Sequence, residues 1–287
     1  MRTRQVVSRQ VDLMSSAREL IKWGEQELAA HVADPSLDAL LLLGEACDLS
    51  RTNVLAQDEV LREHVERFEG FIARRKLSEP IQYITGRAYF RQLTFAVGPG
   101  VLIPRPESEN LVSDVMSKIA HLSEPKVLDL GAGSGALALS IALELPGSRV
   151  TAVEKDRAAL AWLRKNVNAL SADIEILETD VADFAGGAEW DAVIANPPYI
   201  PQSEALPLEV AKFEPGSALF GGSLGIEVPR LFIDAAARAL KPHGYLAIEH
   251  HESQGGAIAD ALSQYFNNVE LHYDLNGRPR WSSGVRK

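Results

Sequence analysis

The chain contains a single cysteine, Cys47, among its 287 residues. One thiol excludes an internal disulfide and any metal site built from several cysteines, and it fits a reducing compartment. Cys47 ends the apolar run 40–47, which reads as part of a helix. We therefore expect a buried structural thiol rather than a nucleophile, and we predict no metal site.

Long hydrophobic runs are also missing. The longest apolar stretches have about ten residues, which is too short to span a bilayer. The first residues, Met1-Arg2-Thr3-Arg4, lead into no apolar segment of the kind found in a signal peptide. An apolar content of 46% and a charged content of 24% are those of a soluble globular protein. We expect a cytoplasmic protein with no membrane partner.

Basic charge is scarce in the later part of the chain. The net charge is −10, and residues 1–105 carry as many acidic as basic side chains, so the whole acidic excess lies in residues 106–287. A duplex-binding enzyme usually has a basic surface. We therefore expect no stable nucleic-acid partner.

The first part of the chain reads as a small helical domain, residues 1–77. Asp34 before Pro35 is a suitable N-cap for a helix that runs to about Cys47. Apolar residues recur at helical spacing between Val60 and Ile72. The basic triplet at 74–76 reads as a solvated helix end, and we expect this domain to recognise the substrate.

Residues 78–105 read as a linker. Alternating apolar residues and turn glycines within 81–103 predict a β-hairpin that bridges two domains.

Residues 106–287 read as an α/β catalytic domain. Strand and helix signals alternate from Lys126, which predicts a parallel sheet covered by helices on both faces. A last segment, 280–285, could add an antiparallel edge strand. The expected strands are 127–130, 150–154, 174–178, 191–195, 245–249 and 269–274; the expected helices are 136–145, 157–170, 227–240 and 255–265.

A glycine-rich segment joins the first of these strands to the first helix. Its residues are Gly131, Ala132, Gly133, Ser134 and Gly135. Glycines let the backbone turn sharply and approach a ligand closely. Glu154, at the end of the next strand, can accept hydrogen bonds from a ribose diol. The glycine segment and Glu154 together indicate an adenosine-containing cofactor. NAD stays open here, because the spacing also satisfies the dinucleotide fingerprint.

A stiff turn, Asn196-Pro197-Pro198-Tyr199, follows the strand 191–195. Proline disfavours the α region for the residue before it and removes a backbone donor. The turn therefore presents one side-chain amide, bare carbonyls and one aromatic ring. Such a site can accept both hydrogens of a planar NH2 group, with the Asn196 oxygen and the Pro197 carbonyl as acceptors, while Tyr199 covers the plane.

Taken together, these motifs resemble those of Rossmann-like, class I S-adenosylmethionine-dependent methyltransferases. Asp129 ahead of Gly-x-Gly-x-Gly resembles their first motif, and Asn-Pro-Pro-Tyr resembles their amino-methyltransferase signature. The resemblance implies S-adenosyl-L-methionine as the cofactor, bound by residues 131–135, Glu154 and Asn196. It places Asp180 where such enzymes contact adenine. Val181 stands where some members place tryptophan against the cofactor.

Further segments resemble the release-factor glutamine methyltransferases over nearly the whole chain. They are 80–86, Leu102-Ile103-Pro104-Arg105-Pro106-Glu107, Ile200, Phe213-Glu214-Pro215 and Ile248-Glu249-His250. Ser108 departs from the family, in which threonine is usual. The resemblance implies N5-methylation of the glutamine in the Gly-Gly-Gln loop of class 1 peptide chain release factors, with residues 196–199 as the catalytic motif. We expect a monomer.

Three other functions stay open. A sibling enzyme with the same chemistry would methylate a glutamine of a ribosomal protein. An adenine-N6 methyltransferase of DNA or RNA would present the same two N–H hydrogens to the same turn. A binding module without catalysis is the third. His250 or Glu249 could also relay a proton, although a positioned amide demands no strong base.

Overall fold

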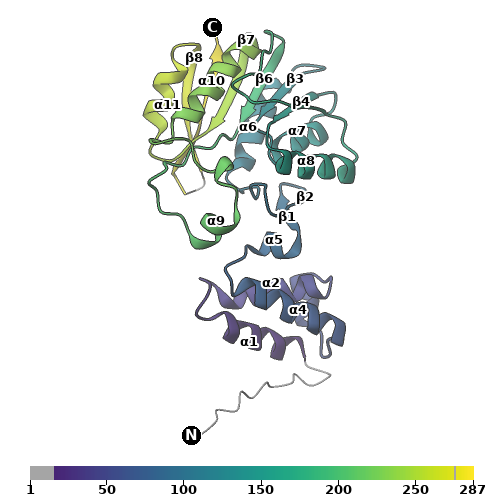
Figure 1. Ribbon diagram of the computed structural model, residues 1–287. Helices are drawn as coiled ribbons and strands as arrows, with labels where there is room; N and C mark the ends of the chain where they lie inside the picture. Colours follow the sequence, from purple (N-terminus) through teal and green to yellow (C-terminus); the bar gives the residue numbers. More distant parts are fainter. Residues whose placement is uncertain (1–15, 275) are drawn as a thin grey trace. The chain divides into compact units, whose positions relative to one another are not determined.

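The computed structural model describes residues 16–274 and 276–287 (Figure 1). Residues 1–4, on which the argument against a signal peptide depends, lie outside the described residues. The chain divides into two compact units, Met1–Thr85 and Gly86–Lys287. The limits predicted at residues 77 and 105 stay predictions. None of the helices within the described residues is long and apolar enough to cross a membrane.

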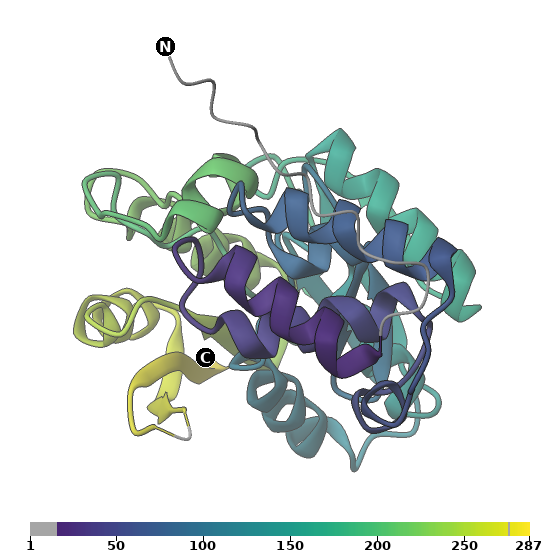
Figure 2. The same ribbon diagram turned by 90° about the horizontal axis from the view of Figure 1, so that it is seen from below.

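Helices packed side by side make up the described part of the first unit (Figures 1 and 2). The Asp34 carboxylate caps the second helix by accepting a hydrogen bond from the Leu37 backbone N–H at 3.0 Å, as predicted. Cys47 is buried, and burial raises the pKa of its thiol, in agreement with a structural role. The helices are α1 (Ala17–Leu28), α2 (Pro35–Ala46), α3 (Arg51–Leu55), α4 (Arg62–Arg75) and α5 (Ile81–Thr85).

The basic triplet 74–76 is a solvated helix end only in part: the side chains of Arg74 and Lys76 are 43% and 37% exposed, but the expectation is wrong for Arg75. Arg75 is only 8% exposed, and its Nε lies 2.7 Å from a carboxylate oxygen of the equally buried Asp38 on α2. The Arg74 guanidinium pairs with Glu79 at 2.8 Å. Arg74 and Arg75 form ion pairs within this unit, because Glu79 and Asp38 lie next to them in the fold.

Residues 81–85, expected within the hairpin, form helix α5 instead. Arg74 donates to the carbonyls of Tyr83 and Ile84, which are among the carbonyls a helix end leaves unpaired. This side chain from α4 stabilises a turn too short to show a helical period in the sequence. The predicted hairpin is confirmed further on, as β1 (Arg87–Phe90) paired with β2 (Leu93–Ala96).

A seven-stranded sheet forms the centre of the second unit, in the order β5-β4-β3-β6-β7-β9-β8. All predicted strands are present. The segment expected as an edge strand, β9, is antiparallel to both of its neighbours and lies between them, so β8 is the edge. The four residues 281–284 are buried, in keeping with this position between two strands. The strands are β3 (Lys126–Leu130), β4 (Arg149–Glu154), β5 (Glu175–Glu178), β6 (Trp190–Ala195), β7 (Leu240–Glu249), β8 (Phe266–Tyr273) and β9 (Pro279–Arg286).

Helices cover both faces of this sheet (Figure 1). Leu128 and Leu130 pack with residues of α10 (Glu227–Ala239) and α11 (Gly255–Leu262). Asp129 points to the opposite face, because side chains alternate along a strand, and there it contacts α7 (Ala136–Glu144). The remaining helices are α6 (Ser108–Ile119), which contacts α7, α8 (Arg157–Leu170), α9 (Leu208–Phe213) and the 3-10 turn Gly216–Ala218. This arrangement confirms the predicted class I methyltransferase fold.

The order of the strands determines where a ligand can bind. From β3 the chain proceeds outward to β4 and β5, and then returns to the other side of β3 as β6 and β7. Open α/β sheets bind ligands beyond the carboxyl ends of the strands at such a reversal. Leu130 of β3 pairs with Ala195 of β6. The glycine segment and the Asn-Pro-Pro-Tyr turn therefore leave the sheet side by side.

Candidate active site

The glycine segment turns directly from β3 into α7. Gly131, Gly133 and Gly135 all have positive φ, which side chains with a Cβ rarely adopt. A Cβ on Gly135 would lie 2.5 Å from Leu163 Cδ1, so this glycine lets α7 pack closely. A Cβ on Gly133 would meet no atom within 4 Å, because it would enter a cavity.

The Glu154 carboxylate lies below this segment and is only 8% exposed. One oxygen accepts a hydrogen bond from the Gly133 backbone N–H at 2.8 Å. The other accepts from the backbone N–H groups of Lys155 and Asp156, both at 2.8 Å. A carboxylate offers about four acceptor sites, so one site remains on the oxygen that contacts Gly133. Glu154 can therefore accept one further hydroxyl hydrogen.

Asp129 is fully buried behind the glycine segment. One of its carboxylate oxygens accepts from the Ala138 backbone N–H at 3.1 Å, and the other has no hydrogen-bond partner within the described part of the chain. Burial raises the pKa of this carboxyl to about 7. Asp129 supports the start of α7 and does not line the cavity.

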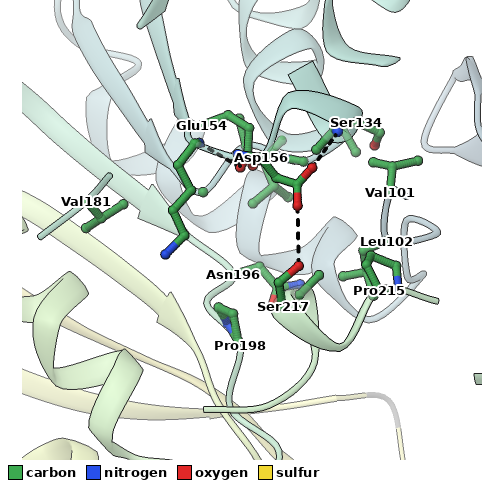
Figure 3. A pocket seen from close by; sticks show the side chains of 18 of the residues that line it. Val101, Leu102, Ser134, Glu154, Asp156, Val181, Asn196, Pro198, Pro215 and Ser217 are labelled. Atoms are coloured by element: carbon green, nitrogen blue, oxygen red, sulfur yellow. Dashed lines mark hydrogen bonds between the residues drawn. The ribbon is translucent and has the colours of Figure 1, made fainter. Parts of the chain in front are cut away.

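A cavity of about 310 Å³ opens in front of the glycine segment (Figure 3). Its wall includes Gly131, Ala132, Gly133, Ser134, Glu154, Asp180, Val181, Asn196 and Pro198, and so brings together most of the predicted residues. Gly135 is the predicted cofactor residue that does not line it. Figure 3 shows Val181 on one flank and Val101 and Leu102 on the other.

Asp180 and Asp156 are the acidic groups beside Glu154 in this wall. The Lys155 ammonium lies 2.9 Å from Asp180, and this bond holds the pKa of the Asp180 carboxyl below its usual value. Asp156 caps α8 and also accepts from the Ser217 hydroxyl at 3.5 Å (Figure 3). Asp156 and Ser217 were not predicted as site residues; for Asp156 the available signal was an aspartate two residues after Glu154.

A second cavity, of about 200 Å³, adjoins the first. Pro197 and Tyr199 line only this one, Pro198 lines only the first, and Asn196 lines both. Within the described residues, the Pro197 carbonyl accepts no hydrogen bond. The other lining residues of the second cavity are Leu102, Arg105, Ile200, Leu206, Pro207, Val210, Ala218 and Leu219.

The wall that the two cavities share is held by an ion pair between distant segments. Arg105 lies 2.6 Å from the buried Glu214, which also accepts from the Ile103 backbone N–H at 3.1 Å. Both segments were predicted only as parts of the family resemblance, without a contact between them. The two residues lie 109 positions apart, and no local pattern in the sequence indicates that they meet.

The two residues considered for proton relay are arranged differently. His250 is buried, and both ring nitrogens are engaged, with the His251 carbonyl and the Ser282 hydroxyl, each at 2.9 Å. Burial lowers the pKa of this imidazole. Glu249 instead accepts a hydrogen bond from the Tyr199 hydroxyl at 3.0 Å. His250 lines neither of these two cavities.

The residues present fit a nucleoside cofactor. Gly133 leaves space where a Cβ would intrude, Glu154 keeps one acceptor site, and apolar side chains such as Val101, Leu102 and Val181 flank the cavity. Among residues 16–274 and 276–287, no group of three or more His, Cys, Asp or Glu side chains could hold a metal ion.

Comparison with known proteins gives matches along nearly the whole chain. Residues 19–86 match the model of the PrmC N-terminal domain, and residues 108–212 match the methyltransferase small domain. A release factor glutamine methyltransferase of Mycolicibacterium smegmatis is 38% identical over 90% of this chain and 93% of that protein. One of Moorella thermoacetica is 39% identical over 90% and 94%.

Among solved structures, a 16S rRNA N2 G1207 methyltransferase of T. thermophilus, in complex with AdoMet and guanosine, has a TM-score of 0.52. It is 24% identical and covers 70% of this chain and 50% of that chain. This likeness supports the fold alone.

Proposed function

The chain belongs to the family of release factor glutamine methyltransferases, and we propose that it methylates the side-chain amide nitrogen of a release-factor glutamine. The methyl donor is S-adenosyl-L-methionine, and the glutamine is that of the Gly-Gly-Gln loop of class 1 peptide chain release factors. The position of Asn196 in the wall common to two cavities carries the proposal. A transferase needs such a meeting point between donor and acceptor.

The larger cavity holds the cofactor. Gly131, Ala132, Gly133 and Ser134 approach it with their backbone, while Gly135 sets the turn behind them. Glu154 accepts one ribose hydroxyl hydrogen at its remaining acceptor site, and Asp180 and Val181 flank the adenine. When bound, S-adenosyl-L-methionine supplies a methyl group activated by its sulfonium.

The smaller cavity holds the glutamine side chain. An amide nitrogen is a poor nucleophile, because its lone pair is delocalised into the carbonyl. The Asn196 side-chain oxygen and the Pro197 carbonyl accept its two N–H hydrogens, which leaves the lone pair directed at the larger cavity. Tyr199 covers the amide plane and excludes water. Such positioning can lower a barrier by up to about 7–11 kcal/mol, so no strong general base is required.

The helical part of the chain, which we place at residues 1–77, recognises the surroundings of the glutamine. Residues 78–105 connect it to the catalytic part, 106–287. The substrate glutamine belongs to a protein loop, and a single side chain offers too few contacts for selection. We further propose that the chain acts as a monomer.

The proposal is tested with labelled cofactor and four acceptors: a release factor, its Gln→Ala loop variant, a ribosomal protein and DNA. Label on the wild-type release factor alone is the expected result. Label on the ribosomal protein or on DNA would replace the proposed substrate by that acceptor. Asn196→Ala should abolish turnover and leave the Kd of the cofactor within a few-fold, because its oxygen contacts the acceptor amide.

A further inference from the structure

Three neighbouring strands end at the same level around the proposed reaction site. Leu130 of β3 pairs with Ala195 of β6, and Ala195 pairs with Ile248 of β7. The next residues are Asn196, directly after β6, and Glu249, the last residue of β7. Strand register therefore brings a carboxylate next to the catalytic turn, although the two lie 53 positions apart.

A network of three hydrogen bonds, one buried and two partly buried, links this carboxylate to the turn. The Ser108 hydroxyl, at the start of α6, lies 2.5 Å from one oxygen of Glu249. The Tyr199 hydroxyl donates to the other oxygen at 3.0 Å. The Asn196 side-chain NH2 donates to the Ser108 oxygen at 3.3 Å. Ser108 and Glu249 are each only 3% exposed, so bulk water is kept from the bond between them, whereas Asn196 and Tyr199 are half-buried.

The direction of each hydrogen bond in this network, from donor to acceptor, follows from the charge of Glu249. An ionised carboxylate only accepts, so both Ser108 and Tyr199 must donate to it. Ser108 has one hydroxyl hydrogen, which it donates to Glu249. Its oxygen can therefore only accept a hydrogen bond from Asn196. Asn196 must then turn its NH2 group to Ser108, and its carbonyl oxygen faces away from Ser108.

We propose that Glu249 is a positioning residue that acts through Ser108 and Tyr199. It orients the Asn196 amide with the oxygen toward the acceptor cavity, and it holds the Tyr199 ring over the same cavity. This inference rests on the proposed function, in which that oxygen accepts an N–H of the substrate amide. With the reverse amide orientation, the NH2 group of Asn196 would face the NH2 group of the substrate amide, and Asn196 could not accept a hydrogen bond from it.

Protonation of Glu249 would remove this control, because one oxygen would then donate. The groups around the carboxyl are Ser108 and Glu107 at the start of α6, Tyr199 of the turn and Arg280 of β9. Burial, the largest effect, raises the pKa of Glu249 above its usual value. Turnover should therefore fall as the pH decreases through this raised pKa, since the carboxylate is the form that sets the orientation.

The test compares Glu249→Gln, Ser108→Ala and Ser108→Thr in the full-length protein. Glu249→Gln and Ser108→Ala should lower kcat for the release factor about ten- to a hundred-fold, the effect expected for a lost hydrogen bond to a charged group. The KM and the cofactor Kd should change only a few-fold. The double variant with Ser108→Ala and Glu249→Gln should have a kcat no lower than that of the slower single variant, because both changes break the same hydrogen-bond network. Ser108→Thr keeps the hydroxyl and should retain kcat.

Glu144→Gln is the matched control, because it breaks a partly buried ion pair with Arg91 outside both cavities. It should leave kcat and its pH profile unchanged. The acidic limb of the profile should be absent in Glu249→Gln. A normal kcat in Glu249→Gln, or a loss of kcat matched by an equal loss of cofactor binding, would overturn the inference.

A second measurement is independent of the substrate. In 15N-labelled free protein, the side-chain NH2 signal of Asn196, assigned by its absence in Asn196→Ala, should shift in Ser108→Ala and Glu249→Gln but not in Glu144→Gln. An unshifted signal would refute the network even if the release factor is methylated. A shifted signal with no methylation of the release factor would support the network and refute the proposed substrate.

Discussion

Gly133 and Gly135 lie two residues apart in the same segment, yet replacing each by alanine should have different consequences. Both have positive φ, +57° and +86°, where a Cβ costs about 1–2 kcal/mol. At Gly133 that is the whole cost to folding, since the Cβ meets nothing within 4 Å. At Gly135 the Cβ would lie 2.5 Å from Leu163 Cδ1 and 3.0 Å from Leu139 Cδ1. Overpacking adds about 1–3 kcal/mol, so Gly135→Ala should lose about 2–5 kcal/mol of unfolding free energy.

Cofactor binding should be affected in the opposite order, with the larger loss of affinity in Gly133→Ala. The Cβ of Gly133→Ala would occupy the cavity assigned to the cofactor, so the Kd of S-adenosyl-L-methionine should rise more than about ten-fold, or 1.4 kcal/mol. Urea unfolding gives the two stabilities, and calorimetry gives the two dissociation constants on folded protein. Unchanged cofactor binding in Gly133→Ala would refute the assignment of the cavity. Equal stabilities of the two variants would refute the packing argument at Gly135.

Three further perturbations test other parts of the structure. Glu154→Ala should weaken cofactor binding by about 1.5–3 kcal/mol, the value of a hydrogen bond to a charged group; an unchanged Kd by calorimetry would disprove the ribose contact. Asp129→Asn tests the buried carboxyl. Its folded pKa of about 7 lies above the ordinary 3.8, so the folded state holds a proton that the unfolded state releases, and the unfolding free energy should fall as the pH rises from about 4 to 7. Asp129→Asn should lose that part of the slope in urea unfolding at pH 5 and pH 8, and an unchanged slope would contradict it. Arg75→Leu should cost about 1.5–3 kcal/mol, the value of a hydrogen bond to a charged group, because it removes the 2.7 Å bond to the buried Asp38 carboxylate; Asp38→Leu in the same chain should recover part of this loss in thermal unfolding, and no recovery would argue against the pair.

The elements predicted best are those whose signals are local. Helix α8 begins and ends where the sequence predicts, because Asp156 caps it and its apolar residues keep a helical period over 14 residues. The strands β3 and β6 were recognisable as short apolar runs before a glycine or a proline. The glycine segment and the turn after β6 were found for the same reason, since each is a contiguous motif.

The features that were missed depend on distant partners. Helix α5 has five residues, too few for a period, and Arg74 stabilises its end. Arg75 is buried because Asp38 lies opposite, 37 positions away. The interior place of β9 depends on the order of strands, which no local pattern specifies. Ser108 was noticed in the sequence only as a family position, Glu249 as a family position and a candidate proton relay, and their contact spans 141 positions.

The relative positions of the site residues depend on the register of the strands more than on any one residue. Gly131, Glu154, Asn196 and Glu249 each follow or end a strand, and the pairs that precede them, Leu130 with Val153 and Ala195 with Ile248, align the four strand ends. A shift of one residue in β6 would move Asn196 to the other face of the sheet. The apolar residues of these strands set the register, because their alternate sides pack against different helices. The hydrophobic core of the sheet therefore determines the geometry of the reacting amide, and a core substitution that displaces β6 should impair turnover without touching any residue of either cavity.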